Sequence, residues 1–177
     1  MTARRSTRAS ASTRTKTLVG PHERAGHWDP RAVDLFTIGF TQTSAERFFE
    51  RLRAAGVKRV VDVRLHNTSQ LAGFAKAGDL RYFLRAIGGI DYVHEPLLAP
   101  TEAMFAAYKK AHGPFSELES GFRALMDERH IEDRIRPDLL DGGCLLCSEA
   151  TPDHCHRRLV AEHLNERWGG LLRVTHL

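Results

Sequence analysis

The stretch VKRVVDVRL at residues 57–65 decides the fold class, because it places Val57, Val60, Val61 and Val63 within seven positions. Valine is β-branched and favours extended backbone. A strand that is apolar at adjacent positions is buried on both faces, as in a parallel sheet covered by helices on each side. The stretch therefore predicts an inner strand of a parallel sheet, with Arg64 at the end of that strand.

Further strand patterns alternate with helical patterns along the rest of the chain. The strand patterns cover residues 35–40, 90–96, 144–149 and 171–177, and residues 66–79 are interpreted as a loop. The helical patterns cover residues 43–55, 79–87, 101–112, 115–130 and 154–167. Parallel strands need long crossovers, and these segments supply them. We expect an α/β fold, a three-layer sandwich of about five mainly parallel strands with flanking helices.

Two helix starts carry capping signals. Thr43 with Glu46 three residues later has the spacing of a capping box, and Asp153 precedes the last helical pattern. We expect Thr43 and Asp153 to cap these helices. Cys155, His156 and Arg157 would then lie in the first turn of the last helix, where free backbone N–H groups favour an anion.

Charge and composition separate a tail from the body of the chain. Residues 1–30 hold six basic and two acidic residues, which account for the whole net charge of +4. We predict a disordered basic tail over 1–33 and a single α/β domain over 34–177. The sequence has no apolar run long enough for a membrane span, so no membrane partner is expected. Three cysteines confined to residues 144–155 argue against a disulfide framework and favour a reducing, cytoplasmic location.

The sequence lacks the glycine-rich motifs that bind ATP phosphates or dinucleotides, and it lacks the glycine–serine elbow of serine hydrolases. ATPases, NAD-dependent oxidoreductases and serine hydrolases are therefore disfavoured, and we expect no cofactor.

The densest group of reactive residues is CLLCSEATPDHCHRR at 144–158. A cysteine near a helix start and an arginine has a lowered pKa and is more nucleophilic. Three interpretations stay open: thiol catalysis by Cys147 and Cys155, a structural metal site at Cys147, Cys155 and His156, or simple packing of the loop. Cys144 cannot join Cys147 on one metal, because residues three apart in a strand point to opposite faces.

A second group of polar residues lies at the ends of two other predicted strands. Asp62 and Arg64 leave the same face of their strand, so Arg64 can bind an anion together with Arg157. Asp62 and Glu149 would orient these arginines. His94 follows the third strand and is a candidate acid–base group.

The chain resembles the family called domain of unknown function 488. Four motifs carry the resemblance: Thr37-Ile38-Gly39-Phe40, Val61-Asp62-Val63-Arg64, Tyr92-Val93-His94, and Leu145-Leu146-Cys147-Ser148-Glu149 leading to Cys155-His156-Arg157-Arg158. Family members often have His where this chain has Phe40, and a Pro- and Arg-rich segment where it has residues 65–70. The resemblance implies a compact α/β fold with the shared residues in one cleft, and it supplies no reaction.

Together these observations predict an anion-binding cleft. Its ligand would be a nucleotide, a nucleic-acid end or another small molecule bearing a phosphate or carboxylate. The leading hypothesis is a thiol-dependent enzyme with Cys147, Cys155 and His94 as catalytic residues. The ligand-binding residues would be Asp62, Arg64, Glu149, His156 and Arg157. The alternative is a binding module without chemistry, assisted by the basic tail.

Overall fold

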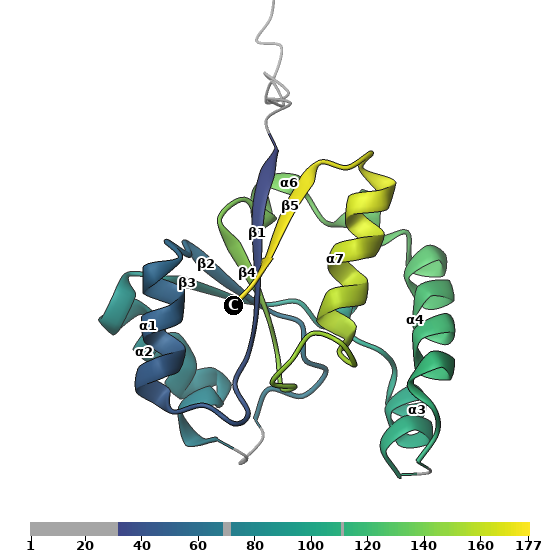
Figure 1. Ribbon diagram of the computed structural model, residues 1–177, viewed down its shortest axis with the longest axis horizontal. Coiled ribbons are helices and arrows are strands. Elements are labelled where there is room, and N and C mark those ends of the chain that lie inside the picture. Colours follow the sequence, from purple (N-terminus) through teal and green to yellow (C-terminus); the bar gives the residue numbers. More distant parts are fainter. Residues whose placement is uncertain (1–31, 69–71, 111) are drawn as a thin grey trace, which may run out of the picture.

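The computed structural model describes residues 32–68, 72–110 and 112–177 (Figure 1). Five strands form one sheet: β1 (Val33–Gly39), β2 (Arg59–Asp62), β3 (Asp91–His94), β4 (Gly143–Cys147) and β5 (Leu172–His176). Each overlaps a segment that the sequence predicts as a strand, although β1 begins two residues earlier than expected, at Val33. The predicted tail lies outside the described residues, apart from its last two positions.

All pairs of neighbouring strands are parallel, in the order β3-β2-β4-β1-β5. The predicted mainly parallel sheet is therefore confirmed. Strand β4 lies in the centre, between β2 and β1, and its five residues are all buried. The register pairs Asp62 with Leu146, so the carboxyl ends of β2 and β4 lie side by side.

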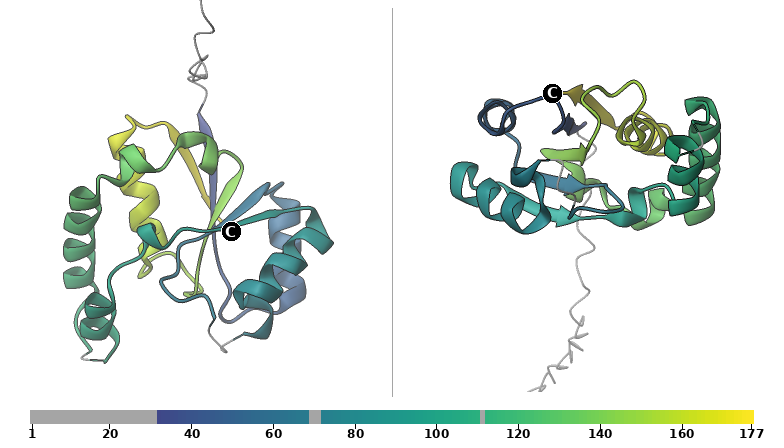
Figure 2. Two further views of the ribbon diagram at one scale, coloured as in Figure 1. Left: turned by 180° about the vertical axis from the view of Figure 1, so that it is seen from behind. Right: turned by 90° about the horizontal axis from the view of Figure 1, so that it is seen from below.

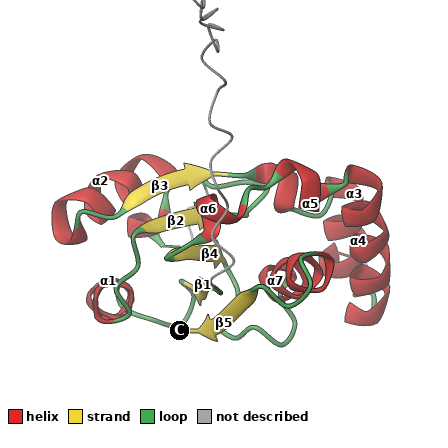
Figure 3. Cartoon of the chain, turned by 90° about the horizontal axis from the view of Figure 1, so that it is seen from above, coloured by secondary structure: helices red, strands yellow, loops and turns green. Residues whose placement is uncertain are grey.

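Helices cover both faces of the sheet, which confirms the three-layer sandwich. The longer helices are α1 (Ala45–Ala54), α2 (Ala77–Gly88), α4 (Phe115–Arg129) and α7 (His156–Arg167). The short segments are η1 (Gly73–Ala75), η2 (Pro96–Leu98), α3 (Glu102–Phe105), the π-helical η3 (Ala106–Lys110), α5 (Ile131–Arg134) and α6 (Pro137–Leu140). Figure 3 shows α1 and α2 on one side of the strands and α3, α4, α5 and α7 on the other. The views in Figure 2 show the same separation.

Alternating side chains of the inner strands supply two separate cores. Val60, Cys144 and Leu146 pack beneath α1 and α2, whereas Val61 and Cys147 pack on the opposite face with α4 and α7. This alternation follows from the two-residue period of a strand. It confirms that Cys144 and Cys147 lie on opposite faces of the sheet.

Both predicted caps are wrong by one or two residues. Ser44, not Thr43, caps α1, because its hydroxyl accepts a hydrogen bond from the backbone N–H of Arg47 at 3.2 Å. Helix α7 begins at His156 with Cys155 as its N-cap, and no side chain caps it. The chain around Asp153 is still a turn, so its carboxylate does not reach that helix start.

The structure also differs from the sequence prediction in the long connections. Helix α2 begins at Ala77, two residues earlier than expected, and η1 lies within the predicted loop. The helix predicted at 101–112 is divided into α3 and η3. The short helices α5 and α6 have no counterpart in the prediction, although Pro137 occupies a first-turn position where proline is favoured.

Among the residues that the structure describes, no helix combines the length and apolarity that a membrane crossing requires.

A close approach at Gly39 connects β1 to the loop after β4. A Cβ atom at this position would lie 1.8 Å from the carbonyl oxygen of Glu149. Gly39 also pairs in register with Cys147, the last residue of β4. The absence of a side chain at Gly39 therefore sets the path of the chain directly after Cys147.

We predict that Gly39→Ala lowers the free energy of unfolding by about 1–3 kcal/mol, the usual cost of overpacking. Gly78→Ala is the matched control, because Gly78 lies in α2 with no atom within 4 Å of an added Cβ. It should be neutral or stabilise the fold by up to about 1 kcal/mol. Urea unfolding of both variants measures the difference, and equal stabilities would show that the approach at Gly39 is not tight.

Candidate active site

A pocket of about 200 Å³ opens at the carboxyl ends of β2 and β4. Its walls come from the end of β2, the end of β4, the α3–η3 segment and the start of α7. This is where parallel sheets usually bind ligands. The polar lining residues include Arg64, His66, Glu102, Tyr108, Lys109, Cys147, Glu149, His154, Cys155 and His156.

A buried ion pair fixes the arginine side of the pocket. The Nε and Nη2 atoms of Arg64 donate to the two carboxylate oxygens of Asp62 at 2.7 and 2.6 Å. The same carboxylate accepts hydrogen bonds from the backbone N–H of Arg64 at 3.2 Å and from the hydroxyl of Tyr92 at 2.7 Å. Asp62 is fully buried and Arg64 is 3% exposed, so the pair has little contact with water. Asp62 orients Arg64 as the sequence predicts.

One guanidinium nitrogen of Arg64 has no hydrogen-bond partner within the described residues. Nη2 also donates to the carbonyl of Ala75 at 2.9 Å, but the buried Nη1 has no hydrogen-bond partner in the described part of the chain. A buried N–H without a partner costs about 1–3 kcal/mol. The ring of Phe40 lies 5.0 Å from the guanidinium carbon and supports it by a cation–π contact. Arg64 is therefore held rigidly, with one donor unused.

Two thiols and an imidazole form the other side of the pocket. The Sγ atoms of Cys147 and Cys155 and a ring nitrogen of His156 lie within 4.8 Å of one another. The Sγ of Cys147 is 3.5 Å from Nδ1 of His156. The Nε2 atom of His156 lies 2.8 Å from the carbonyl of Val63, which can only accept. Nε2 therefore carries the proton, and Nδ1 faces the thiol with a free lone pair.

The surroundings favour the thiolate at Cys147. The thiol of Cys155 beside it lowers the pKa of Cys147 most, and the backbone N–H groups of Glu149 and Ser148 and the charge of Arg157 lower it further, against the effect of burial. Cys155 has a raised pKa, first because of its interaction with Cys147 and then because of burial. Burial lowers the pKa of His156, which keeps this imidazole neutral near pH 7. The pocket therefore contains one thiol whose pKa is lowered beside another whose pKa is raised.

Arg157 holds the loop that follows β4. Its Nη1 donates to the carbonyl of Glu149 at 2.6 Å and to Sγ of Cys155 at 3.2 Å, and its Nη2 donates to the carbonyl of Ala150 at 3.4 Å. The side chain is fully buried and is not among the residues that line the pocket. The geometry thus gives no support to the prediction that Arg157 binds a ligand anion, because its guanidinium donates hydrogen bonds to backbone carbonyls instead.

Two other predicted site residues also have different surroundings from those expected. Nε2 of His94 lies 2.8 Å from the backbone carbonyl of Arg64, on edge strand β3, and His94 does not line the pocket. The carboxylate of Glu149 pairs with Lys109 at 3.0 Å and not with an arginine. Glu149 stays at the mouth of the pocket, whereas β2 separates His94 from the strand that carries Cys147.

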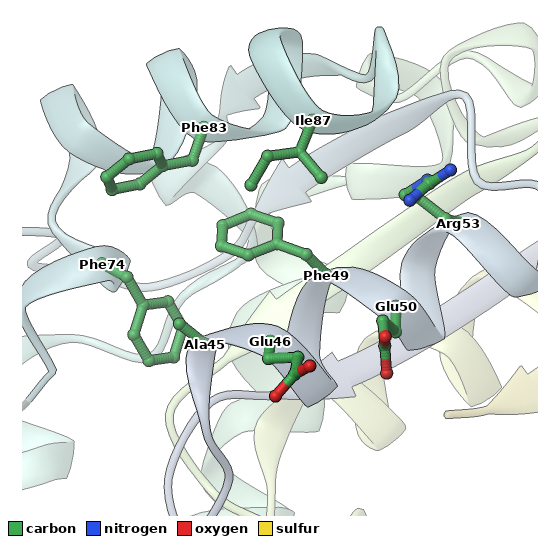
Figure 4. Close-up of a pocket in the computed structure, with 8 residues that line it drawn as sticks. All are labelled: Ala45, Glu46, Phe49, Glu50, Arg53, Phe74, Phe83 and Ile87. Atoms are coloured by element: carbon green, nitrogen blue, oxygen red, sulfur yellow. The ribbon is translucent and has the colours of Figure 1, made fainter.

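A second hollow lies between α1 and α2, and its lining contains no thiol or imidazole. Figure 4 shows its lining, where Phe49, Phe74, Phe83 and Ile87 form an apolar surface with two glutamates and an arginine at the rim. None of its lining residues is a cysteine or a histidine. The candidate active site is therefore the pocket at Cys147.

The sequence does not predict the contacts of two residues that shape the site. An aromatic residue in a strand indicates an apolar wall, but the hydroxyl of Tyr92 donates to Asp62. Lys109 belongs to η3, which the β3–β4 connection brings against the pocket. Its place depends on the path of a long crossover that no local pattern specifies.

We predict that Asp62→Asn lowers the free energy of unfolding by about 3–5 kcal/mol, because it leaves Arg64 buried without a counter-charge. Asp34→Asn is the matched control, since Asp34 forms a bidentate pair with Arg173 at the surface, as Asp62 does with Arg64 in the interior. That exposed pair is worth at most about 1 kcal/mol. Similar losses for both variants in urea unfolding would contradict the central place of the buried pair.

We predict that Cys147 reacts with iodoacetamide at a pH below that at which an ordinary thiol reacts, because its lowered pKa keeps the thiolate present there. Cys144 and Cys155, whose pKa values are raised, should react more slowly at every pH. Mass spectrometry of peptides from protein alkylated over a pH series measures all three rates. Equal rates for the three cysteines would contradict the assignment.

Comparisons with known proteins support a family assignment. Searches of curated proteins and of solved structures found no significant match to the chain. The family model described as domain of unknown function DUF488 matches residues 44–164, which include the whole of the Asp62–Arg64 pair and the Cys147–Arg157 segment. This match covers more than half of the chain and includes three of the four sequence motifs, since only Thr37-Ile38-Gly39-Phe40 precedes it. The chain belongs to the DUF488 family.

Proposed function

We propose that the protein is a thiol-dependent enzyme in which Cys147 attacks a small substrate bearing a phosphate or a carboxylate. The observation that carries this proposal is the juxtaposition of two groups in one pocket. Cys147 has surroundings that favour its thiolate, and Arg64 has a buried donor without a partner among the described residues. A charge-assisted hydrogen bond from Arg64 would bind the anionic group and place the reacting atom at the sulfur.

The neighbouring residues have distinct parts in this proposal. His156 is the base that takes the thiol proton, since Nδ1 lies 3.5 Å from Sγ of Cys147 and the Val63 carbonyl fixes the ring. Asp62 is a positioning residue that acts through Arg64. Arg157 is a positioning residue that fixes the loop after Cys147. Such a site requires free thiols, which favours a reducing compartment such as the cytoplasm.

A metal site is the second candidate, and one specific observation favours it. Cys147, Cys155 and His156 place three ligand atoms within 4.8 Å of one another. The hydrogen bond from Nε2 of His156 to a backbone carbonyl is also the usual orientation of a metal-binding imidazole. Elemental analysis of the purified protein distinguishes the candidates: stoichiometric zinc supports the metal site, and metal-free protein with a reactive Cys147 supports the enzyme.

Two alkylating reagents test the proposed anion site. Iodoacetate carries a carboxylate and iodoacetamide does not, so the ratio of their rates at Cys147 reports recognition of the anion. We predict that Arg64→Lys, which keeps the charge beside Asp62 but removes the guanidinium, lowers this ratio about tenfold. Inorganic phosphate should slow both reagents in the wild-type protein. Arg173→Lys at the exposed pair is the matched control and should leave the ratio unchanged.

The wild-type measurements remain decisive if the Arg64→Lys variant does not fold. Preference for iodoacetate that phosphate abolishes supports the proposal. Equal rates for both reagents, without protection by phosphate, would show that no anion site lies beside Cys147. Phosphate binding at Arg64 combined with an unreactive Cys147 would indicate a binding module and overturn the enzyme.

A further inference from the structure

We propose that Cys147 and Cys155 act as a nucleophilic and a resolving cysteine, and that the substrate is a small disulfide that carries a carboxylate. This inference rests on the proposed function and names its substrate class. It assigns a use to Cys155, which the simple nucleophile mechanism does not require.

The position of Cys155 is the first reason for this inference. Its Sγ lies within 4.8 Å of Sγ of Cys147, although the two residues come from different elements, the end of β4 and the N-cap of α7. A disulfide needs about 2 Å between the sulfurs, so the two side chains must move closer together for the bond to form. Cys144 is excluded from such a pair, because it lies on the opposite face of the sheet.

The difference between the two thiols is the second reason. Thiol–disulfide exchange needs an attacking thiolate and a neighbour that stays protonated until the second step. Sγ of Cys147 lies 3.5 Å from Nδ1 of His156, which can take its proton, whereas Sγ of Cys155 accepts a hydrogen bond from Nη1 of Arg157 at 3.2 Å. A ring nitrogen of His156 lies within 4.8 Å of both sulfurs, so the same imidazole can serve Cys155 in the second step.

The first step forms a mixed disulfide. His156 takes the Cys147 proton, the Cys147 thiolate attacks one sulfur of the substrate, and the substrate S–S bond breaks. One half leaves and takes that proton from Nδ1 of His156, so the imidazole is neutral again. In the second step, Cys155 gives its proton to Nδ1 of His156 and attacks Sγ of Cys147. The mixed disulfide breaks and releases the other half as a thiolate. Two electrons pass from the cysteine pair to the substrate, and a cellular dithiol reduces the Cys147–Cys155 disulfide again.

The shape and charge of the pocket indicate the substrate class. Arg64 lines the pocket and its buried Nη1 has no partner among the described residues, so this nitrogen would bind the carboxylate. Lys109, which pairs with Glu149, lies at the mouth. A shallower hollow of about 400 Å³ adjoins the pocket and shares Tyr108, Lys109 and Glu149 with it. The two hollows together leave room for both halves of a disulfide, one beside Cys147 and one beyond the Lys109–Glu149 pair.

The test uses two coloured disulfides with the reduced, full-length protein. Dithiobis(nitrobenzoate) carries carboxylates, and 4,4′-dithiodipyridine is neutral. The wild-type protein should release two thiols per molecule from the carboxylated reagent and lose two hydrogens, with the peptides that contain Cys147 and Cys155 joined in the mass spectrum. Cys155→Ser should release one thiol and retain the other half on Cys147. Cys144→Ala is the matched control and should behave as the wild type does.

The carboxylated reagent should react at least about tenfold faster with wild type than with Arg64→Lys, while the neutral reagent shows a smaller difference. A stable mixed disulfide on Cys147 in the wild-type protein would overturn the resolving role and leave the nucleophile intact. No reaction of Cys147 with either reagent would overturn both this inference and the proposed function. Stoichiometric zinc that blocks both reagents would also overturn them, in favour of the metal site.

Discussion

The buried pair of Asp62 and Arg64 is the interaction on which the site depends. Four hydrogen bonds reach the Asp62 carboxylate, from three donors of Arg64 and from the Tyr92 hydroxyl. Burial lowers the pKa of Arg64, but the hydrogen bonds to Asp62 and the charge of that residue raise it by more, so the guanidinium keeps its charge. Because Nε and Nη2 already have partners, Nη1 is the guanidinium nitrogen that remains without one in the described part of the chain. The pair thus holds Arg64 in one orientation at the edge of the pocket.

The sheet brings this donor to the sulfur. Parallel pairing of β2 with β4 aligns their carboxyl ends, so Arg64 and Cys147 open into the same pocket although they lie far apart in the sequence. Strand periodicity places Cys147 on the same face as α7 and leaves Cys144 in the opposite core. Arg157 then holds the loop after Cys147 by its carbonyls, which keeps Cys155 and His156 beside that sulfur. The fold therefore brings the Arg64 guanidinium, Cys155 and His156 to the pocket that contains the Cys147 sulfur.

Much of this arrangement follows from local sequence patterns. The valines of β2, the apolar run of β4 and the helical segments between them predict a parallel sheet with two covered faces. The rule that ligands gather at the carboxyl ends of strands then brings Arg64, Cys147, Cys155 and His156 to one edge. The two-residue period of a strand correctly places Cys144 and Cys147 on opposite faces of the sheet. These inferences succeed because they depend on backbone geometry and on burial.

The sequence did not predict the hydrogen-bond partners of individual side chains. The sequence predicts that Arg157 binds a ligand, but in the folded chain its guanidinium faces backbone carbonyls. It also predicts His94 at the site, but the edge strand puts this residue beyond Arg64. Tyr92 and Lys109 reach the site through tertiary packing alone. Such partners are set by long-range contacts, which neither composition nor periodicity encodes.

The most direct test of the central claim is a crystal structure of the Cys147→Ser variant soaked with selenate, whose anomalous signal locates the anion. If Arg64 binds an anion beside residue 147, selenate lies in the pocket, hydrogen-bonded to Nη1 of Arg64 and next to the hydroxyl introduced at position 147, with the Asp62 pair unchanged. A pocket without selenate, with Nη1 bonded to a side chain of the protein itself, would show that Arg64 is not an anion-binding residue.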